Sequence, residues 1–243
     1  LMASETGKQA RSSITVIYNH EGAAAGELVK RGGFSAFVRL EDRSLVFDAG
    51  GEGSVVFENL ERLGLGDTQL QAIVISHNHW DHVFGLPGVM SRAPDYPPVY
   101  VPTSAAGGIK QQYPRAEVIP VDGPMKIAPE VWVTEPLETE FLGAPLSEQA
   151  LVLERPDGLH VVVGCSHPGI VAIVERISGR GQRVLVTRTD PDVHAQVLAV
   201  RPEARYHAAA RCITVETAPA PTLAGRVAGR AAISLSTDLP SSI

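Results

Sequence analysis

The sequence is poor in cysteine, aromatic residues and basic charge, and each shortage excludes a class of protein. It has 21 Lys and Arg residues and 27 Asp and Glu residues, which gives a net charge of −6. Proteins that bind nucleic acids or membrane surfaces need a basic face. Two cysteines are too few for a disulfide framework and indicate a reducing compartment. No apolar run reaches the roughly 18 residues of a membrane-spanning helix. We expect a cytoplasmic protein that binds neither nucleic acid nor membranes.

The elements that are present predict an α/β fold. Short β-branched or apolar runs bounded by turn residues predict strands at 14–18, 34–40, 44–47, 72–75, 99–101, 116–121, 131–133, 149–154, 159–163 and 183–186. Helices are predicted over 170–177 and after Ser54, which we expect to cap the earlier helix. That helix repeats apolar residues at helical spacing: Val56, Phe57, Leu60 and Leu63.

The domain organisation is predicted to be simple. Residues 1–12 lack the apolar stretch of a signal peptide and form a flexible N-terminal segment, where Leu1 ahead of Met2 suggests an added residue. Without an internal repeat or a long linker, residues 13–243 form a single domain. From about residue 187 this domain becomes atypical, and the chain after 201 has few large apolar side chains, so its order is left open.

The stretch ISHNHWDH, residues 75–82, concentrates ionisable groups directly after an apolar run. Neutral imidazole and carboxylate are the first-choice ligands of zinc and related divalent ions. A surface or capping role explains one such histidine but not four metal-type side chains. We expect His77 and His79 to bind one ion and Asp81 and His82 to bind another. Zinc is the expected metal, with manganese or iron as alternatives.

Two aromatic residues flank this metal-binding loop. Trp80 and Phe84 are predicted to form an apolar wall for the substrate, and core packing beneath the loop is the alternative.

A second segment, VVVGCSHPGI at 161–170, again runs from an apolar strand through a loop into a helix. His167 is well placed to complete a metal shell, and the alternative is a hydrogen bond to the helix N-terminus. Cys165 is either a soft ligand that supports the site or a packed residue.

These motifs resemble the HxHxDH signature of the metallo-β-lactamase superfamily. The resemblance covers roughly residues 13–185 and implies an αββα sandwich, two mixed β-sheets with helices on the outer faces, with a dinuclear metal site at one edge. Asp48 stands where that family carries a supporting Asp, and we expect it to orient a ligating histidine through its second nitrogen. The segments GCSHPGI, SEQAL and HNHWDHVFGLPG together are similar to the subgroup of the archaeal dihydropterin–ribofuranosylaminobenzene-phosphate synthase.

The C-terminal part departs from that subgroup, which usually shows Gly-Gly-x-His and later His-Cys-Thr-Gly. The corresponding stretches here are 187–190 and 211–214, and both histidines are missing. Asp190 and His207 are candidate replacements, with His194 a weaker one. Each of them, taken alone, fits an exposed polar residue better than a ligand.

The resemblance implies a metal-dependent hydrolase with two divalent ions and a small-molecule substrate. A metal-bound hydroxide attacks an ester, an amide (lactam) or a phosphoester, and Asp81 is both a ligand and the acceptor for the water's proton. Two alternatives stay open: a pterin-type synthase that releases pyrophosphate, and a degenerate, non-catalytic binding protein. An RNA-processing role is disfavoured by the acidic charge. The oligomeric state is not predicted.

Overall fold

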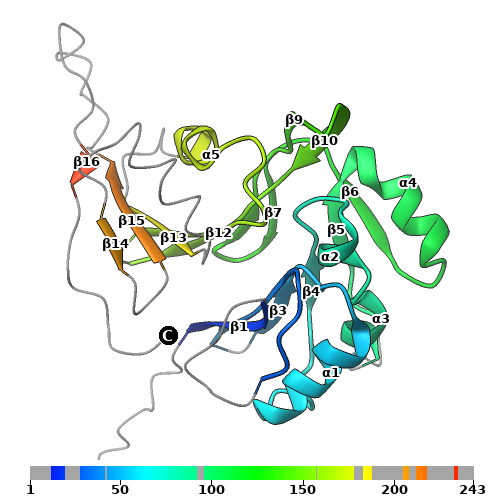
Figure 1. Ribbon diagram of the computed structural model, residues 1–243. Helices are drawn as coiled ribbons and strands as arrows, with labels where there is room; N and C mark the ends of the chain where they lie inside the picture. Colours follow the sequence, from blue (N-terminus) through cyan, green and yellow to red (C-terminus); the bar gives the residue numbers. More distant parts are fainter. Residues whose placement is uncertain are drawn as a thin grey trace, which may run out of the picture. The chain divides into compact units, whose positions relative to one another are not determined.

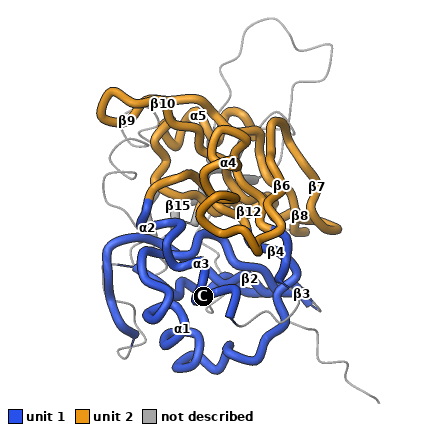
Figure 2. Tube along the Cα trace, turned by 90° about the vertical axis from the view of Figure 1, so that its right-hand side faces the viewer, with its two compact units in different colours: residues 1–73, 80–98, 242–243 blue, residues 74–79, 99–241 orange. Residues whose placement is uncertain are grey.

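The computed structural model (Figure 1) describes residues 12–19, 28–41, 43–91, 96–156, 158–177, 183–187, 205–207, 212–217 and 233–234. Beyond residue 177 the backbone alone is described, apart from the buried side chain of Val186. The chain divides into two compact units (Figure 2): residues 1–73, 80–98 and 242–243 form unit 1, and residues 74–79 and 99–241 form unit 2. Each unit is described in turn.

Unit 1 is built on an antiparallel run of strands β1 (Ser13–Asn19), β2 (Phe34–Leu40) and β3 (Arg43–Phe47). Strand β2 is followed by Glu41 at φ +42°. Strand β4 (Ala72–Val74) begins in this unit. Its helices are α1 (Gly53–Arg62), α2 (Trp80–Val83) and α3 (Leu86–Met90).

Helix α1 corrects two details of the sequence analysis. Its N-cap is Glu52 rather than Ser54, and no side chain caps it. The predicted apolar face is also shifted, because Phe57 is 39% exposed while the polar Asn59 is fully buried. The Asn59 amide donates hydrogen bonds to the carbonyls of Ile17 and Val29, and its oxygen accepts one from Val29 N. These three bonds satisfy the buried amide and tie α1 to the first strand and the loop that follows it.

Unit 2 begins with a parallel pair, β5 (Val99–Pro102) and β6 (Val118–Val121), which are connected by helix α4 (Thr103–Gln112). A larger mixed sheet follows, with the order β14-β15-β13-β12-β11-β8-β7. Its strands are β7 (Met125–Ala128), β8 (Val131–Val133), β11 (Leu151–Arg155), β12 (Gly158–Val162), β13 (Arg183–Thr187), β14 (Arg205–His207) and β15 (Cys212–Thr217), with β16 (Ile233–Ser234) paired to β15. Strands β9 (Leu137–Phe141) and β10 (Ala144–Glu148) form a separate hairpin.

Helix α5 (Ile170–Ile177) covers one face of this larger sheet (Figure 1). Its apolar stripe at i, i+3, i+4 and i+7 packs into one buried cluster with sheet residues that include Val152, Leu159 and Val161. Each fully buried aliphatic side chain contributes roughly 1.5–3 kcal/mol. This packing fixes the start of α5, and with it the loop that carries His167.

The expected α/β class, with mixed sheets and helices, is confirmed. Parallel pairing of β12 with β13 and of β5 with β6 occurs beside antiparallel pairs. Among the described residues, every helix is too short or too polar to cross a bilayer.

Candidate functional site

Three histidines of unit 2 meet at the ends of two apolar strands, and we call His77, His79 and His167 the histidine cluster. His77 and His79 follow β4, whereas His167 stands in the loop between β12 and α5. The ring centroids of His77 and His79 are 4.5 Å apart, and His167 lies 4.9 Å and 4.8 Å from them. His167 lies about ninety positions from His77 and His79 in the sequence, and all three follow core strands, whose ends commonly carry functional groups.

Hydrogen bonds orient the rings of this cluster. His77 is fully buried, and its Nδ1 lies 2.8 Å from Ser76 Oγ. Its Nε2 lies 3.0 Å from His79 Nδ1, so two ring nitrogens of separate histidines face each other. Two zinc-bound nitrogens at about 2.1 Å from a tetrahedral ion are roughly 3.4 Å apart, close to the separation seen here.

Cys165 adds a fourth donor to the same place. One ligand atom each from His77, Cys165 and His167 lies within 4.8 Å of the others. Imidazole nitrogens with a thiol are a donor set typical of zinc. The residues present therefore fit a divalent ion of that kind.

A buried carboxylate, Glu148, holds the loop of His167. Glu148 is 1% exposed, and its two oxygens accept hydrogen bonds from Ser166 N at 2.8 Å and His167 N at 2.7 Å. Ser166 has φ +58°, a left-handed conformation that is uncommon outside glycine and asparagine. The carboxylate stabilises this strained turn by satisfying both backbone donors.

The sequence analysis missed Glu148 as a site residue, although it lies in the SEQAL segment that carried the resemblance. The available signal was an acidic residue followed by an apolar strand. Gly164 completes the arrangement, because a Cβ there would lie 2.2 Å from Ser76 Oγ and 2.9 Å from Glu148 Oε1. Only glycine lets the two polar groups approach the loop so closely.

Unit 1 holds the other half of the HNHWDH motif. His82 Nδ1 lies 2.6 Å from Asp48 Oδ2, and both side chains are almost fully buried. When His82 Nδ1 donates to the Asp48 carboxylate, the Nε2 lone pair of His82 is left available for a ligand. Asp81 Oδ2 lies 3.8 Å from that Nε2. The structure thus places the Asp48 carboxylate against a ring nitrogen of His82, and a role of Asp48 behind a metal ligand stays a prediction.

Replacing Asp48 with asparagine is expected to weaken metal binding by about 10- to 100-fold, the usual cost of losing a partner behind a ligating histidine. The amide keeps the volume but loses the charge that fixes the His82 tautomer. Titration against a chromogenic chelator measures the change. The exposed Asp67 offers the matched Asp67→Asn control, and equal affinities in both variants would contradict the role.

Trp80 and Phe84 are exposed, at 58% and 48%, which does not fit the core-packing alternative. The Trp80 ring lies over Gly51, where a Cβ would be 2.7 Å from Trp80 Cζ3 and 3.3 Å from the Tyr18 hydroxyl. Burial raises the pKa of Tyr18 above its usual value of 10.0, an effect that a backbone hydrogen bond with Gly51 opposes. The Tyr18 phenol is therefore neutral at physiological pH.

The C-terminal candidates are not tested by the structure. Asp190 and His194 lie outside the described residues. The backbone of His207 pairs with Cys212 in the β14–β15 ladder, but its side chain is not among those described.

The chain is similar to several known proteins. The family model of the Metallo-beta-lactamase superfamily matches residues 28–181, and a LarB/PurE-like N-terminal domain model matches residues 164–217. The 7,8-dihydropterin-6-methyl-4-(beta-D-ribofuranosyl)-aminobenzene-5'-phosphate synthase of Methanocaldococcus jannaschii is 22% identical over 188 residues, 59% of this chain and 64% of the synthase. The chain thus spans less than two thirds of that relative.

Two further matches differ in extent. Ribonuclease Z of Treponema pallidum is 41% identical over 70 residues, which are 28% of this chain and 22% of the ribonuclease. The crystal structure of a metal-dependent hydrolase of the beta-lactamase superfamily aligns with a TM-score of 0.60 at 20% identity, over 79% of this chain and 84% of that one. At this identity the likeness shows the shared fold.

Proposed function

The chain belongs to the metallo-beta-lactamase superfamily, and from this membership we propose that it is a metal-dependent hydrolase. Its substrate is a small molecule with an ester, amide (lactam) or phosphoester bond. One observation carries the proposal: ring nitrogens of His77, His79 and His167 converge beside the Cys165 thiol. A purely structural role explains a single buried histidine but not this convergence of metal-type donors.

In this proposal each half of the HNHWDH motif would contribute to the binding of one divalent ion. Zinc is the expected metal. The histidine cluster and Cys165 would hold one ion, and Asp81 and His82 would hold the other. A divalent ion supplies Lewis acidity, which polarises the substrate's carbonyl or phosphoryl oxygen and makes a water acidic near neutral pH.

The chain's own residues supply orientation and proton transfer. Asp48 fixes the imidazole of His82, and Ser76 and Glu148 hold His77 and the His167 loop. Asp81 is 26% exposed, so its carboxylate is accessible to accept the proton that an attacking water loses. Trp80 and Phe84 present apolar surface to the substrate.

The alternatives have less support. The synthase match is distant, at 22% identity, and does not favour release of pyrophosphate over hydrolysis. A non-catalytic binding protein of the same fold would not need the convergent donors. A cytoplasmic location remains a prediction from the cysteine content.

Metal analysis of the purified protein, supplied with zinc or manganese after preparation without chelator, tests the proposal. We expect about two ions per chain, as in the two-metal hydrolases, and hydrolysis that stops on chelation and returns with metal. A single ion would restrict the site to one half of the motif. No bound ion and no hydrolysis of esters, lactams or phosphoesters would overturn the proposal in favour of a binding protein.

A further inference from the structure

The β9–β10 hairpin has an unusual tip. Its strands pair from Leu137↔Glu148 to Phe141↔Ala144, which leaves Leu142 and Gly143 as the two-residue turn. Both have positive φ, +51° and +81°, as a type I′ turn requires. Asn-Gly and Asp-Gly are the preferred pairs for this turn, and leucine is not.

Leu142 breaks two local rules at once. Its backbone lies in the left-handed region, where a leucine Cβ is strained, and its side chain is 90% exposed. Asparagine would remove both penalties. Residues that violate local preferences without a structural gain are concentrated at functional sites, so the exposed Leu142 side chain is a candidate contact for a ligand.

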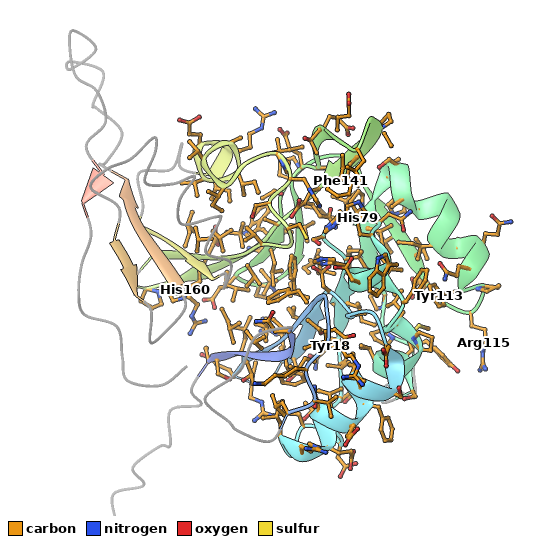
Figure 3. The ribbon with its side chains drawn as sticks, viewed as in Figure 1. Tyr18, His79, Tyr113, Arg115, Phe141 and His160 are labelled. Carbon is orange, nitrogen blue, oxygen red and sulfur yellow. The ribbon has the colours of Figure 1, made fainter. Side chains whose placement is uncertain are left out.

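The neighbouring Phe141 connects this tip with the histidine cluster. Its ring centroid lies 4.7 Å from that of His79 and 4.8 Å from that of His167, and Phe141 is itself 40% exposed. Figure 3 shows Phe141 next to His79, while His160 of the same unit lies well apart from both. The apolar end of the hairpin thus borders the proposed site of reaction.

The charge of the hairpin limits which chemical groups can bind beside its tip. It carries Glu138, Glu140 and the buried Glu148 but no Lys or Arg between residues 137 and 148. Ser147 Oγ donates to the Glu138 carboxylate, which holds that side chain against the hairpin. A negatively charged group beside this tip would be repelled, and a neutral apolar group would not be.

We propose that the β9–β10 hairpin is a specificity element, in which Leu142 and Phe141 bind an uncharged, apolar acyl or aryl group next to the bond that is cleaved. The inference rests on the proposed hydrolase function and narrows it to neutral esters and amides with an apolar side. Phosphomonoesters are poor substrates at the same site.

The decisive variant is Leu142→Asn, which removes the apolar surface and suits the turn better than leucine does. With metal-loaded enzyme, we expect kcat/KM for p-nitrophenyl octanoate to fall about 10-fold, the equivalent of losing part of one buried aliphatic contact. The value for p-nitrophenyl acetate should change less than about 2-fold, because acetate is too short to use that contact. Phe57→Ala, which truncates an exposed aromatic of α1, is the control and leaves the ratio unchanged.

A binding measurement separates this inference from the proposed function. The neutral fluorescent probe N-phenyl-1-naphthylamine is titrated into metal-free wild type and Leu142→Asn, and we expect several-fold weaker binding to the variant. If metal-loaded wild type cleaves no ester, amide or phosphoester, the proposed function fails while the probe still decides the role of the hairpin. Equal losses on both esters, or unchanged selectivity with unchanged probe binding, would overturn the hairpin proposal. So would conversion of a dimer into monomers by Leu142→Asn with unchanged selectivity, since the tip would then join two copies of the chain.

Discussion

The double substitution His77→Ala with His79→Ala is expected to remove the ion of the histidine cluster and to reduce kcat/KM by more than about 100-fold. Loss of even an outer partner of a metal-binding histidine costs about 10- to 100-fold, and this variant deletes two of the proposed ligand side chains. Elemental analysis of the variant should show about one ion fewer per chain than wild type, since two-metal sites hold their ions by separate ligands. Activity and metal are measured on the same preparation.

Folding must be followed alongside activity, because His77 is fully buried. Its truncation leaves a small cavity beside Ser76, whose hydroxyl loses its contact with Nδ1, at a cost of about 1–3 kcal/mol. His79→Ala alone avoids that cost, since His79 is half-buried, and should still lower metal content and activity. His160→Ala in β12 is the matched control, being a histidine outside the cluster. A folded double variant that keeps its metal and its activity would exclude the proposed mechanism.

The histidine cluster could be predicted from the sequence because its signals are local. In both HNHWDH and GCSHPGI, metal-type side chains follow an apolar run directly, and a strand's end is where a sheet presents functional groups. The core strands are apolar on both faces, so they are recognised without knowledge of their neighbours.

Other features depended on tertiary contacts. The β9–β10 hairpin was missed because LETEF contains Glu138 and Glu140, which are uncommon in strands, and its turn has no Asn or Asp before Gly143. Asn59 rather than Phe57 lies on the buried side of α1, because its amide donates hydrogen bonds to the carbonyls of Ile17 and Val29. The helical periodicity of the sequence does not reveal these bonds. Local pattern identifies an apolar face, but only the fold shows where a buried polar group is satisfied.

Glu148 is the strongest case of this kind, and its substitution should have the second large effect. In Glu148→Gln the amide keeps one acceptor oxygen but turns an NH₂ group toward the backbone N–H of Ser166 or His167. One buried donor then loses its partner, which costs about 1–3 kcal/mol of stability. Because the His167 backbone is released from its fixed position, we also expect metal affinity to fall about 10- to 100-fold. Glu130→Gln, at an exposed ion pair with Arg155, is the matched control and should cost no more than about 1 kcal/mol.

A double-mutant cycle distinguishes positioning from general destabilisation. If Glu148 acts on the ion through the His167 side chain, then Glu148→Gln should weaken metal binding less than about 2-fold in a His167→Ala background, because coupled residues are non-additive. Chelator competition is run at a temperature where every variant is folded, as judged by circular dichroism. An undiminished effect in the His167→Ala background would show that the carboxylate acts on metal binding by another route. A purely structural role would lower the unfolding temperature of Glu148→Gln and leave its metal affinity at the wild-type value. The predicted result, a loss of affinity that requires His167, would instead establish the buried carboxylate as the residue that positions this ligand.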